Sequence, residues 1–72
     1  MRQDTIGARV ATIRRQRGMT LQQVGDRSGL PPSTVQRIEH DRTKDPGVWT
    51  LHAIAHALDV SLSTLWMGAT RP

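Results

Sequence analysis

The sequence contains no cysteine, phenylalanine or tyrosine, and its only large aromatic side chains are two tryptophans. Because cysteine is absent, the chain forms no disulfide, offers no thiolate nucleophile and cannot build a cysteine-based zinc site. The core must instead be filled by aliphatic side chains. Proteins that bind single-stranded nucleic acid use stacking aromatic rings, and two tryptophans far from the basic segment do not supply such a platform.

Long apolar runs are missing as well. No stretch approaches the roughly 18 apolar residues of a membrane-spanning helix, and the N-terminal residues MRQDTIGARV contain no signal-peptide core. No segment alternates polar and apolar residues for long enough to predict a β-strand. We therefore expect a cytoplasmic, all-α protein that has no membrane partner. Its 72 residues make a single small domain (1–72, ordered core about 5–68) that buries about 60–65% of its unfolded surface.

Positive charge is concentrated in the first part of the chain. The net charge is +4, with a sequence pI near 11.5. Residues 1–44 contain nine of the ten lysines and arginines and four of the six acidic residues, a local charge of +5, whereas residues 45–72 carry −1. This asymmetry favours a polyanionic partner for one side of the molecule. The alternative is that the arginines only keep a small helical domain soluble.

Residues 20–39, TLQQVGDRSGLPPSTVQRIE, have the pattern of two short helices joined by a tight turn. Thr20 is a good N-cap, and Gln23 three residues later completes a capping box. Gly29 stands where the first of these helices should end in a left-handed residue. Gly25 lies inside that helix, where glycine costs roughly 1 kcal/mol relative to alanine, so we expect a helix to cross closely there.

The second helix of this pair has two alternative starts. A proline at the first helical position loses no useful donor, which favours a start at Pro32. The segment from Ser33 to Gln36 is itself a capping-box pattern and would start the helix later, leaving it fewer than two turns. The earlier start, which we prefer, places Val35 and Ile38 on the inward face. The residues that point elsewhere are then Ser33, Gln36, Arg37 and His40.

Three further helices are expected around this pair. The first is capped by Asp4 or Thr5 and ends at Gly18. The fourth helix of the chain stops near Asp59, and the fifth is capped by Ser61. Their core-facing residues are expected to be Ile6, Val10 and Ile13 in the first helix, Val48, Leu51, Ile54, Ala55 and Leu58 in the fourth, and Leu62, Leu65 and Trp66 in the fifth.

The order and spacing of these elements resemble the helix-turn-helix domains of the lambda-repressor/Cro (XRE-like) family. The family's small residue falls on Gly25, its turn glycine on Gly29, and its two core aliphatics on Val35 and Ile38. The resemblance covers about residues 6–68 and includes five elements in the correct order. It implies a five-helix, lambda-repressor-like fold with a central helix-turn-helix that binds double-stranded DNA through the major groove.

The resemblance also implies roles for individual residues. Pro32 replaces a polar base reader and would offer only apolar contact, and Leu21 replaces a glutamine that commonly contacts a phosphate. Arg37 is the best candidate for bidentate recognition of guanine and Gln36 for adenine, although an Arg37 bound to phosphate would carry little sequence information. The base-reading positions are Pro32, Ser33, Gln36 and Arg37. The phosphate-contacting positions are Gln22, Thr34, Arg42, Thr43 and Lys44.

Two more roles concern the fold and its association. Arg14 matches a family position that pairs with a glutamate at the end of the recognition helix, and Glu39 is the only glutamate in the sequence. Such a structural ion pair would lock two helices together; the alternative is a surface arginine. Trp49 matches a family site that is usually polar and exposed. It either lies over the edge of the core, which we favour, or anchors an interface, since exposed aromatic residues are enriched at hot spots.

Nothing in the sequence predicts catalysis, a metal site or a cofactor. His52 and His56 have the i, i+4 spacing of two zinc ligands, but no HExxH glutamate lies between them and no third ligand is apparent. There is no nucleophile elbow, phosphate-binding loop or segment of paired carboxylates, and a 72-residue bundle has little room for a lined pocket. We therefore expect a non-enzyme.

The resulting hypothesis is a repressor-type transcription regulator that binds a two-fold-symmetric operator in double-stranded DNA, as a homodimer on the DNA. The main alternative is an antitoxin, or another regulator whose principal partner is a protein. Such a partner would be bound through apolar residues around Trp49, Trp66 and Met67. A third interpretation is that the chain is the DNA-binding segment of a longer regulator.

Overall fold

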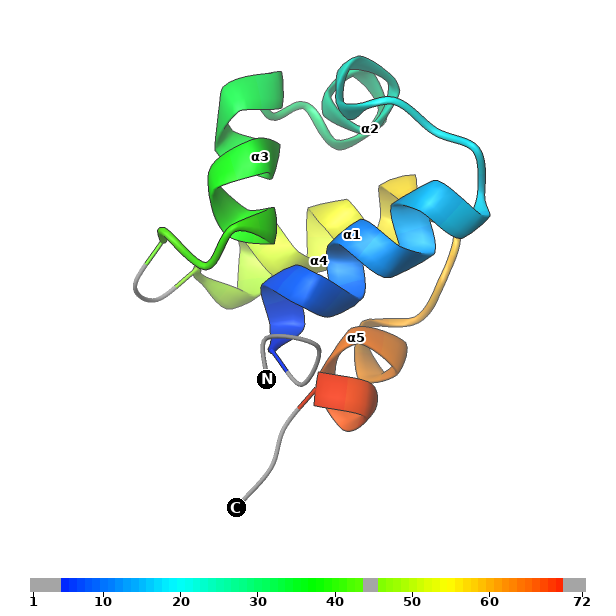
Figure 1. Cartoon of the computed structure of the whole chain (residues 1–72), viewed down its shortest axis with the longest axis vertical. Coiled ribbons are helices and arrows are strands. Elements are labelled where there is room, and N and C mark those ends of the chain that lie inside the picture. Colours follow the sequence, from blue (N-terminus) through cyan, green and yellow to red (C-terminus); the bar gives the residue numbers. More distant parts are fainter. Residues whose placement is uncertain (1–4, 44–45, 70–72) are drawn as a thin grey trace.

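The computed structural model describes residues 5–43 and 46–69 of the chain (Figure 1). All regular structure in these residues is helical, and they contain no strand. The expected all-α fold with five helices is therefore confirmed. The helices are α1 (Ile6–Gln16), α2 (Leu21–Ser28), α3 (Pro32–Glu39), α4 (Val48–Ala57) and α5 (Leu62–Ala69).

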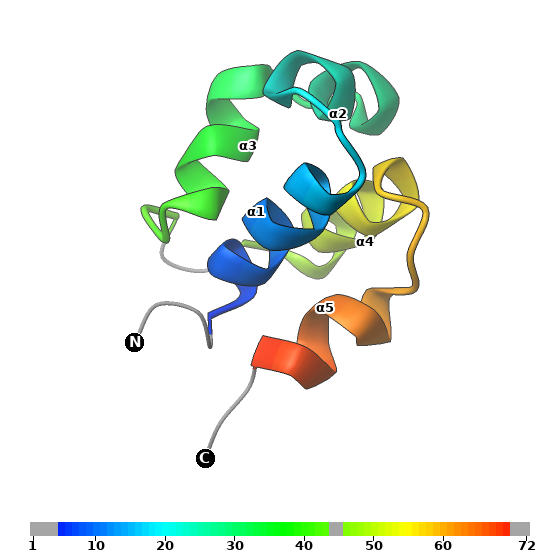
Figure 2. The same ribbon diagram turned by 45° about the vertical axis from the view of Figure 1, so that its right-hand side comes forward.

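The helices surround one aliphatic core, and α3 lies at its edge. Helix α1 packs against α3 and α5, α2 packs against α3 and α4, and α4 packs against α5 (Figures 1 and 2). Because α3 is held mainly by α1 and α2, one side of it faces solvent. The fully buried large side chains of the core are Val10, Val24, Val35, Ile54, Leu58 and Leu65.

The turn between α2 and α3 follows from its local sequence signals. The Thr20 hydroxyl accepts a hydrogen bond from the Gln23 amide at 3.0 Å, and the Gln23 side chain accepts one from the Thr20 amide at 2.8 Å. Gly29 ends α2 with φ of 79°, in the left-handed region. Helix α3 begins at Pro32, so the alternative later start is wrong. These features set the angle between α2 and α3.

Gly25 is required by the close approach of the same turn. A Cβ atom at this position would lie 2.7 Å from the carbonyl oxygen of Leu30 and 3.3 Å from Cγ of Pro32. A side chain at position 25 is therefore excluded by the turn and by the first residue of α3. A close approach, as expected from the cost of a mid-helix glycine, is present, but it comes from the connection between α2 and α3 and the first residue of α3 rather than from a crossing of two helices.

Helix ends elsewhere also match their sequence signals. Thr5 caps α1 by accepting a hydrogen bond from the Ala8 amide at 3.0 Å, whereas Asp4, the other candidate cap, lies outside the described residues. Asp41 and Asp59 follow α3 and α4 with φ of 58° and 60°. Aspartate enters this left-handed region more readily than most residues, so both helices stop without the usual glycine.

Of the expected core residues, Ile6 and Leu62 are only partly buried, and two others are exposed. Val48 is 63% exposed and Trp66 is 50% exposed. Val48 lies on the same apolar face of α4 as the buried Leu51. It is the first residue of the helix, however, and at this end none of the other described helices packs against that face. Trp66 follows the buried Leu65, so the turn of about 100° per helical residue directs it toward the surface. Both assignments to the core were wrong.

Within the described part of the chain, none of the helices has the length and apolar character needed to cross a membrane.

Candidate nucleic-acid interface

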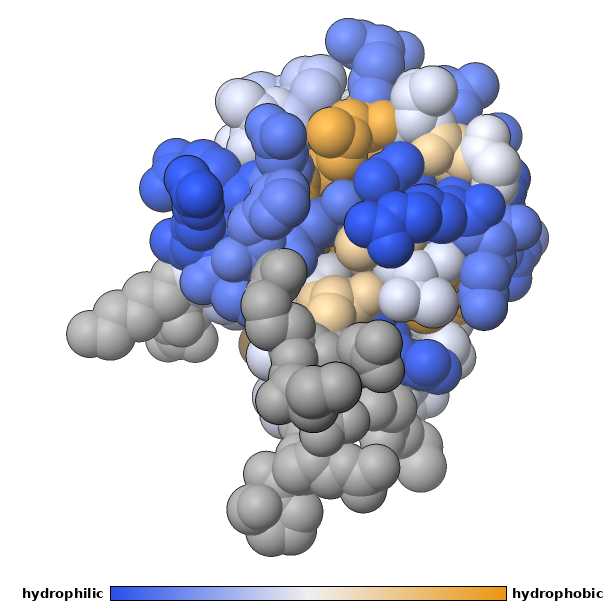
Figure 3. Space-filling view, in the orientation of Figure 1, coloured by the Kyte–Doolittle hydropathy of each residue, from blue (hydrophilic) through white to orange (hydrophobic). Residues whose placement is uncertain are grey.

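The outer side of α3 is a polar surface on a rigidly held helix. Val35 and Ile38 are 0% and 3% exposed and fix its inner side in the core. Ser33, Gln36 and Arg37 are exposed on the other side. Hydrophilic side chains cover the side of the molecule on which α3 lies (Figure 3). A helix with a buried aliphatic side and an exposed side of hydrogen-bonding groups is suited to contact base edges in a major groove.

The structure brings part of the expected interface together. Gln36, Arg37 and Arg42 line one open depression of about 320 Å³, and His40 is its fourth lining residue. Arg42 directly follows the left-handed Asp41, and its backbone N–H donates to the carbonyl oxygen of Arg37 at 2.8 Å. The end of α3 therefore folds back so that Arg42 lies beside the outer side of the helix.

The N-terminal end of α3 is less free than the sequence suggested. Pro32 and Thr34 are only partly exposed. The Pro32 ring packs over Gly25 of α2, so part of its surface is engaged within the domain. Gln22 on α2 is exposed, and its side-chain amide donates to Oδ1 of Asp26 at 2.9 Å. A phosphate contact by Gln22 requires that this surface hydrogen bond be exchanged.

Thr43 and Lys44 do not join this group. Thr43 is partly buried and lines a different depression, which also includes Thr5 and Asp41 at the start of α1 and the end of α3. Lys44 lies outside the described residues. Their expected phosphate contacts therefore remain predictions from the sequence.

An ion pair between Arg14 and Glu39 fixes the C-terminal end of α3. Nε of Arg14 lies 2.6 Å from Oε2 of Glu39, and Nη2 lies 3.1 Å from Oε1, which is the paired geometry of an arginine–carboxylate contact. Glu39 is 5% exposed and Arg14 is 16% exposed. Nη1 of Arg14 also donates to the carbonyl oxygen of Met19 at 2.9 Å. The interpretation of Arg14 as an unpaired surface residue is therefore wrong.

A second connection between α1 and α3 was not expected from the sequence. The Thr5 hydroxyl, which caps α1, donates to Oδ2 of Asp41 at 3.0 Å. A Cβ atom on Gly7 would overlap the Ile38 carbonyl oxygen and the Asp41 carboxylate. The carboxylate of Asp41 thus lies at the N-terminus of α1, where the helix dipole stabilises negative charge. The cost of a glycine inside a helix, which identified Gly25, would also have identified Gly7.

Trp49 lies on the surface of α4. It is 83% exposed, so the interpretation that it covers the edge of the core is wrong. Its ring contacts that of His52 edge-on, with the ring centroids 6.3 Å apart. The neighbouring Val48 is also exposed, so two large apolar side chains face solvent at the start of α4.

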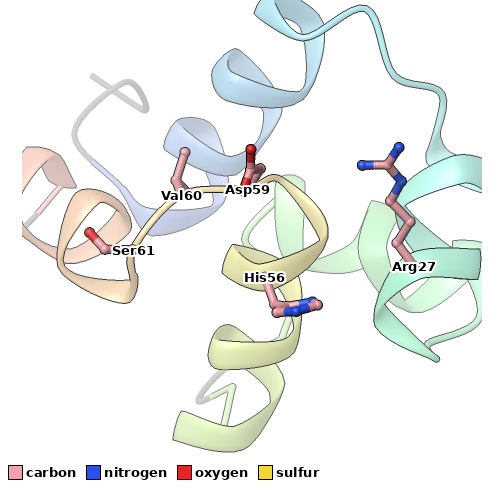
Figure 4. A pocket seen from close by; sticks show the side chains of 5 residues that line it. All are labelled: Arg27, His56, Asp59, Val60 and Ser61. Carbon is pink, nitrogen blue, oxygen red and sulfur yellow. The ribbon is translucent and has the colours of Figure 1, made fainter.

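No metal centre is formed by the part of the chain that the structure describes. His52 and His56 are both exposed on α4, and no group of three or more potential ligands occurs among the described residues. His56 lines an open groove of about 610 Å³ between α2 and the connection from α4 to α5 (Figure 4). The other residues of this groove, Arg27, Asp59, Val60 and Ser61, include none of the expected DNA contacts.

Comparison with known proteins places this geometry in a family. Residues 10–65 match the model of the helix-turn-helix family. The immunity repressor protein of Bacillus phage phi105 is 36% identical over 61 residues, which are 85% of this chain and 42% of that protein. The HTH-type transcriptional regulator SinR of Bacillus subtilis is 30% identical over 60 residues, which are 83% of this chain and 54% of SinR.

Two further similarities extend the comparison. The uncharacterized HTH-type transcriptional regulator y4dJ of Sinorhizobium fredii is 38% identical over 56 residues, which are 78% of this chain and 71% of that protein. A crystal structure of SinR, the master regulator for biofilm formation, in complex with DNA has a TM-score of 0.80 to this fold at 29% identity. The match covers 86% of this chain and 98% of that chain. The chain spans about half the length of the phage repressor and of SinR. By its family match, its identity to these regulators and its fold, the chain belongs to the lambda-repressor/Cro-like (XRE-type) family of helix-turn-helix domains.

Proposed function

We propose that this domain binds double-stranded DNA sequence-specifically and acts as a repressor-type transcription regulator, as a homodimer on a two-fold-symmetric operator. The observation that carries the proposal is the exposed polar side of α3, with Ser33, Gln36 and Arg37, opposite the buried Val35 and Ile38. The similarity to a phage repressor and to SinR, whose matched structure is a complex with DNA, supports the same function.

The proposed binding mode follows from where the side chains lie. Helix α3 enters the major groove, where Arg37 is suited to guanine and Gln36 to adenine. Pro32 and Ser33 lie nearest the start of the helix and contact neighbouring base edges. Arg42 contributes phosphate contacts from the connection after α3. Phosphate contacts from α2 and α3 are assigned to Gln22 and Thr34.

The remaining features fit a binding protein rather than a catalyst. The excess of positive charge in residues 1–44, a segment that includes α3, favours a polyanionic partner. We further propose that the protein is not an enzyme and needs no cofactor. A repressor that occupies its operator blocks RNA polymerase by its presence there, and this requires DNA binding alone. A regulator of transcription acts where the chromosome is, so we place it in the cytoplasm.

The function is tested by selecting bound sequences from a random duplex library with the purified protein. The expected result is enrichment of a sequence with two inverted half-sites, about one helical turn apart, because a two-fold-symmetric dimer reads a palindrome. Failure to enrich any sequence over the starting library, at both low and moderate salt, would contradict sequence-specific binding.

Arg37→Ala should weaken the discrimination between DNA sequences, whereas Arg42→Ala should weaken the affinity for every duplex. Arg37→Ala is expected to cost about 1–3 kcal/mol per half-site on the selected duplex and to relax the preference at one base pair. Arg42→Ala should weaken binding to all duplexes alike and lower the salt slope by about one unit per half-site. Binding titrations on the selected and a scrambled duplex across a salt series separate the two effects.

Each variant serves as the control for the other, because both remove an exposed arginine from the same depression. Neither should change the melting temperature appreciably, since neither side chain is in the core. If Arg37→Ala lowers affinity for the selected and scrambled duplexes equally, Arg37 is a phosphate contact. Base reading would then rest on Ser33 and Gln36.

The exposed Trp49 favours a protein contact as part of the function. In the proposed dimer it anchors the second copy on DNA, because a tryptophan that is 83% exposed contributes little to its own domain. Trp49→Ala is expected to reduce cooperative occupancy of two half-sites by about 1–3 kcal/mol while leaving binding to one isolated half-site unchanged. Titrations on one-site and two-site duplexes measure the difference.

Trp66→Ala is the matched control, because it makes the same chemical change at a half-buried tryptophan on α5. Trp66→Ala should lower the unfolding free energy of the domain, and it should leave the cooperative binding to two half-sites nearly unchanged. Equal losses on one-site and two-site duplexes for Trp49→Ala would mean that Trp49 contacts DNA itself. No loss on either duplex, together with a co-purified small protein from the native host, would favour an antitoxin-like regulator.

A further inference from the structure

The depression beside the second half of α3 contains a residue to which the proposed binding mode gives no role. His40 lines this depression together with Gln36, Arg37 and Arg42, and its volume of about 320 Å³ exceeds that of a phosphate group. His40 is exposed and is the C-cap of α3. It follows Gln36 by four residues and Arg37 by three, which places all three on one face of the helix.

The charged groups around this depression are positive and available. Among the described residues, no hydrogen bond or ion pair is formed by the side chains of Arg37, His40 or Arg42. Among the residues that the structure describes, no carboxylate lines the depression. In the proposed binding mode Arg37 reads a base, so His40 and Arg42 are the side chains that can hold an anion in this open space.

The nearest carboxylates on α3 and its extension are turned elsewhere. Glu39 pairs with Arg14 of α1, and Asp41 accepts the Thr5 hydroxyl at the start of α1. Neither residue lines the depression. The sequence neighbours of His40 on both sides thus direct their negative charge to α1.

The other elements packed against α3 also leave His40 without an acidic neighbour. On α2, Asp26 accepts a hydrogen bond from Gln22, and Arg27 lines the separate groove with His56. On α1, Arg9 donates to the Thr64 carbonyl oxygen of α5, and no other charged residue of α1 or α2 lines the depression. Within the described part of the chain, a bound anion would therefore face Gln36 and the positive groups.

We propose that this depression binds one phosphodiester of the DNA backbone in each half-site, and that His40 holds it together with Arg42. The inference rests on the proposed function, since the anion is supplied by the duplex. A neutral imidazole offers one N–H donor to the phosphate, whereas the imidazolium offers a charge-assisted hydrogen bond. Phosphate binding therefore favours the protonated imidazole, and we expect higher affinity at pH 6 than at pH 8.

The test is a titration of the selected and a scrambled duplex at pH 8 and pH 6, in phosphate-free buffer of constant ionic strength. The wild type should bind both duplexes about 3- to 10-fold more tightly per half-site at pH 6, because a phosphate contact is independent of sequence. The salt slope at pH 6 should be larger by about one unit per half-site. His40→Gln should bind with the same affinity at both pH values.

Two further variants make the result specific to His40. His56→Gln is the matched control, because His56 is also exposed but lines the other groove, and it should keep the wild-type pH dependence. His40→Arg should bind tightly at both pH values, because it restores a permanent charge. Tight binding by His40→Arg at pH 8 cannot result from a folding defect, because unfolding would weaken binding.

The outcomes separate this inference from the proposed function. Specific binding by the wild type that does not change between pH 8 and pH 6 would overturn the inference alone. So would a pH dependence that persists in His40→Gln, which would then belong to another group. Absence of any specific binding by the wild type at both pH values would overturn the proposed function, and the inference with it.

Discussion

Glu39→Gln is expected to lower the free energy of unfolding by roughly 2–4 kcal/mol. The side chain of Glu39 is 5% exposed, and both of its oxygens lie within hydrogen-bonding distance of the Arg14 guanidinium. The amide leaves this guanidinium without its counter-charge and turns an N–H₂ group toward other donors. Because Arg14 is 16% exposed, water compensates for part of the loss, and the cost stays below that of a fully buried pair. A thermal or urea unfolding curve measures the change.

Asp59→Asn is the matched control, because it is also an acid-to-amide change within an ion pair. Asp59 is 90% exposed and lies 4.0 Å from Nη1 of Arg17. Asparagine also tolerates the left-handed backbone at this position, where φ is 60°. An exposed pair of this kind contributes about 0–1 kcal/mol, so the melting curve should nearly coincide with that of the wild type. If Glu39→Gln melts like Asp59→Asn, the buried pair does not lock the fold.

The position of this pair explains why it matters for function. A single guanidinium joins α1, the connection to α2 through the Met19 carbonyl oxygen, and the last residue of α3. The outer side of α3 can read DNA only if the helix is held at a fixed angle, because a base-edge hydrogen bond tolerates little displacement. The pair therefore contributes to the geometry of the interface without belonging to it.

Local signals were sufficient to predict the helix-turn-helix. The capping box at Thr20, the left-handed Gly29 and the proline that opens α3 each act through backbone geometry within a few residues. Such signals do not depend on what packs against the helix. The left-handed Asp41 and Asp59 end α3 and α4 by the same kind of local backbone geometry.

The limits of the core could not be predicted in the same way. Nearly every residue of α4 is apolar or small, so periodicity alone did not distinguish Leu51, which is buried, from Val48 and Trp49, which are exposed. Whether a residue at the start of α4 is exposed depends on where the helices packed against α4 end. Trp66 was misassigned for a related reason, because α5 covers the core mainly through Leu65.

The candidate interface was predictable where it depends on helix spacing and unpredictable where it depends on tertiary contacts. The outward direction of Ser33, Gln36 and Arg37 follows from the inward direction of Val35 and Ile38. The spacing also directed His40 outward, but its place beside Arg42 depends on the fold of the chain after α3. Thr43 lies in a different depression from Gln36, Arg37 and Arg42, and this too depends on how the chain folds after α3.

Gly7→Ala is expected to destabilise the domain by about 2 kcal/mol or more. Alanine favours a helix over glycine by roughly 1 kcal/mol, so helix propensity alone predicts the opposite sign. At this position, however, the Cβ atom would overlap the backbone carbonyl oxygen of Ile38 and the carboxylate of Asp41. A backbone atom of α3 cannot rotate away as a side chain can, so α1 and α3 must move apart and disturb the packing of Val10 and its neighbours. A urea unfolding curve measures the cost.

Gly47→Ala provides the control for this prediction. It makes the same chemical change at the N-cap of α4, where φ is −67° and no atom of the described residues, apart from the two chain neighbours, lies within 4 Å of the added Cβ. Its unfolding free energy should stay within about 1 kcal/mol of the wild type, because only the cap preference changes. Binding to the selected duplex should likewise fall for Gly7→Ala and not for Gly47→Ala, since only the former displaces α3. A Gly7→Ala variant as stable as wild type or more so would show that helix propensity outweighs the close contact, and that α1 and α3 can separate without loss of packing.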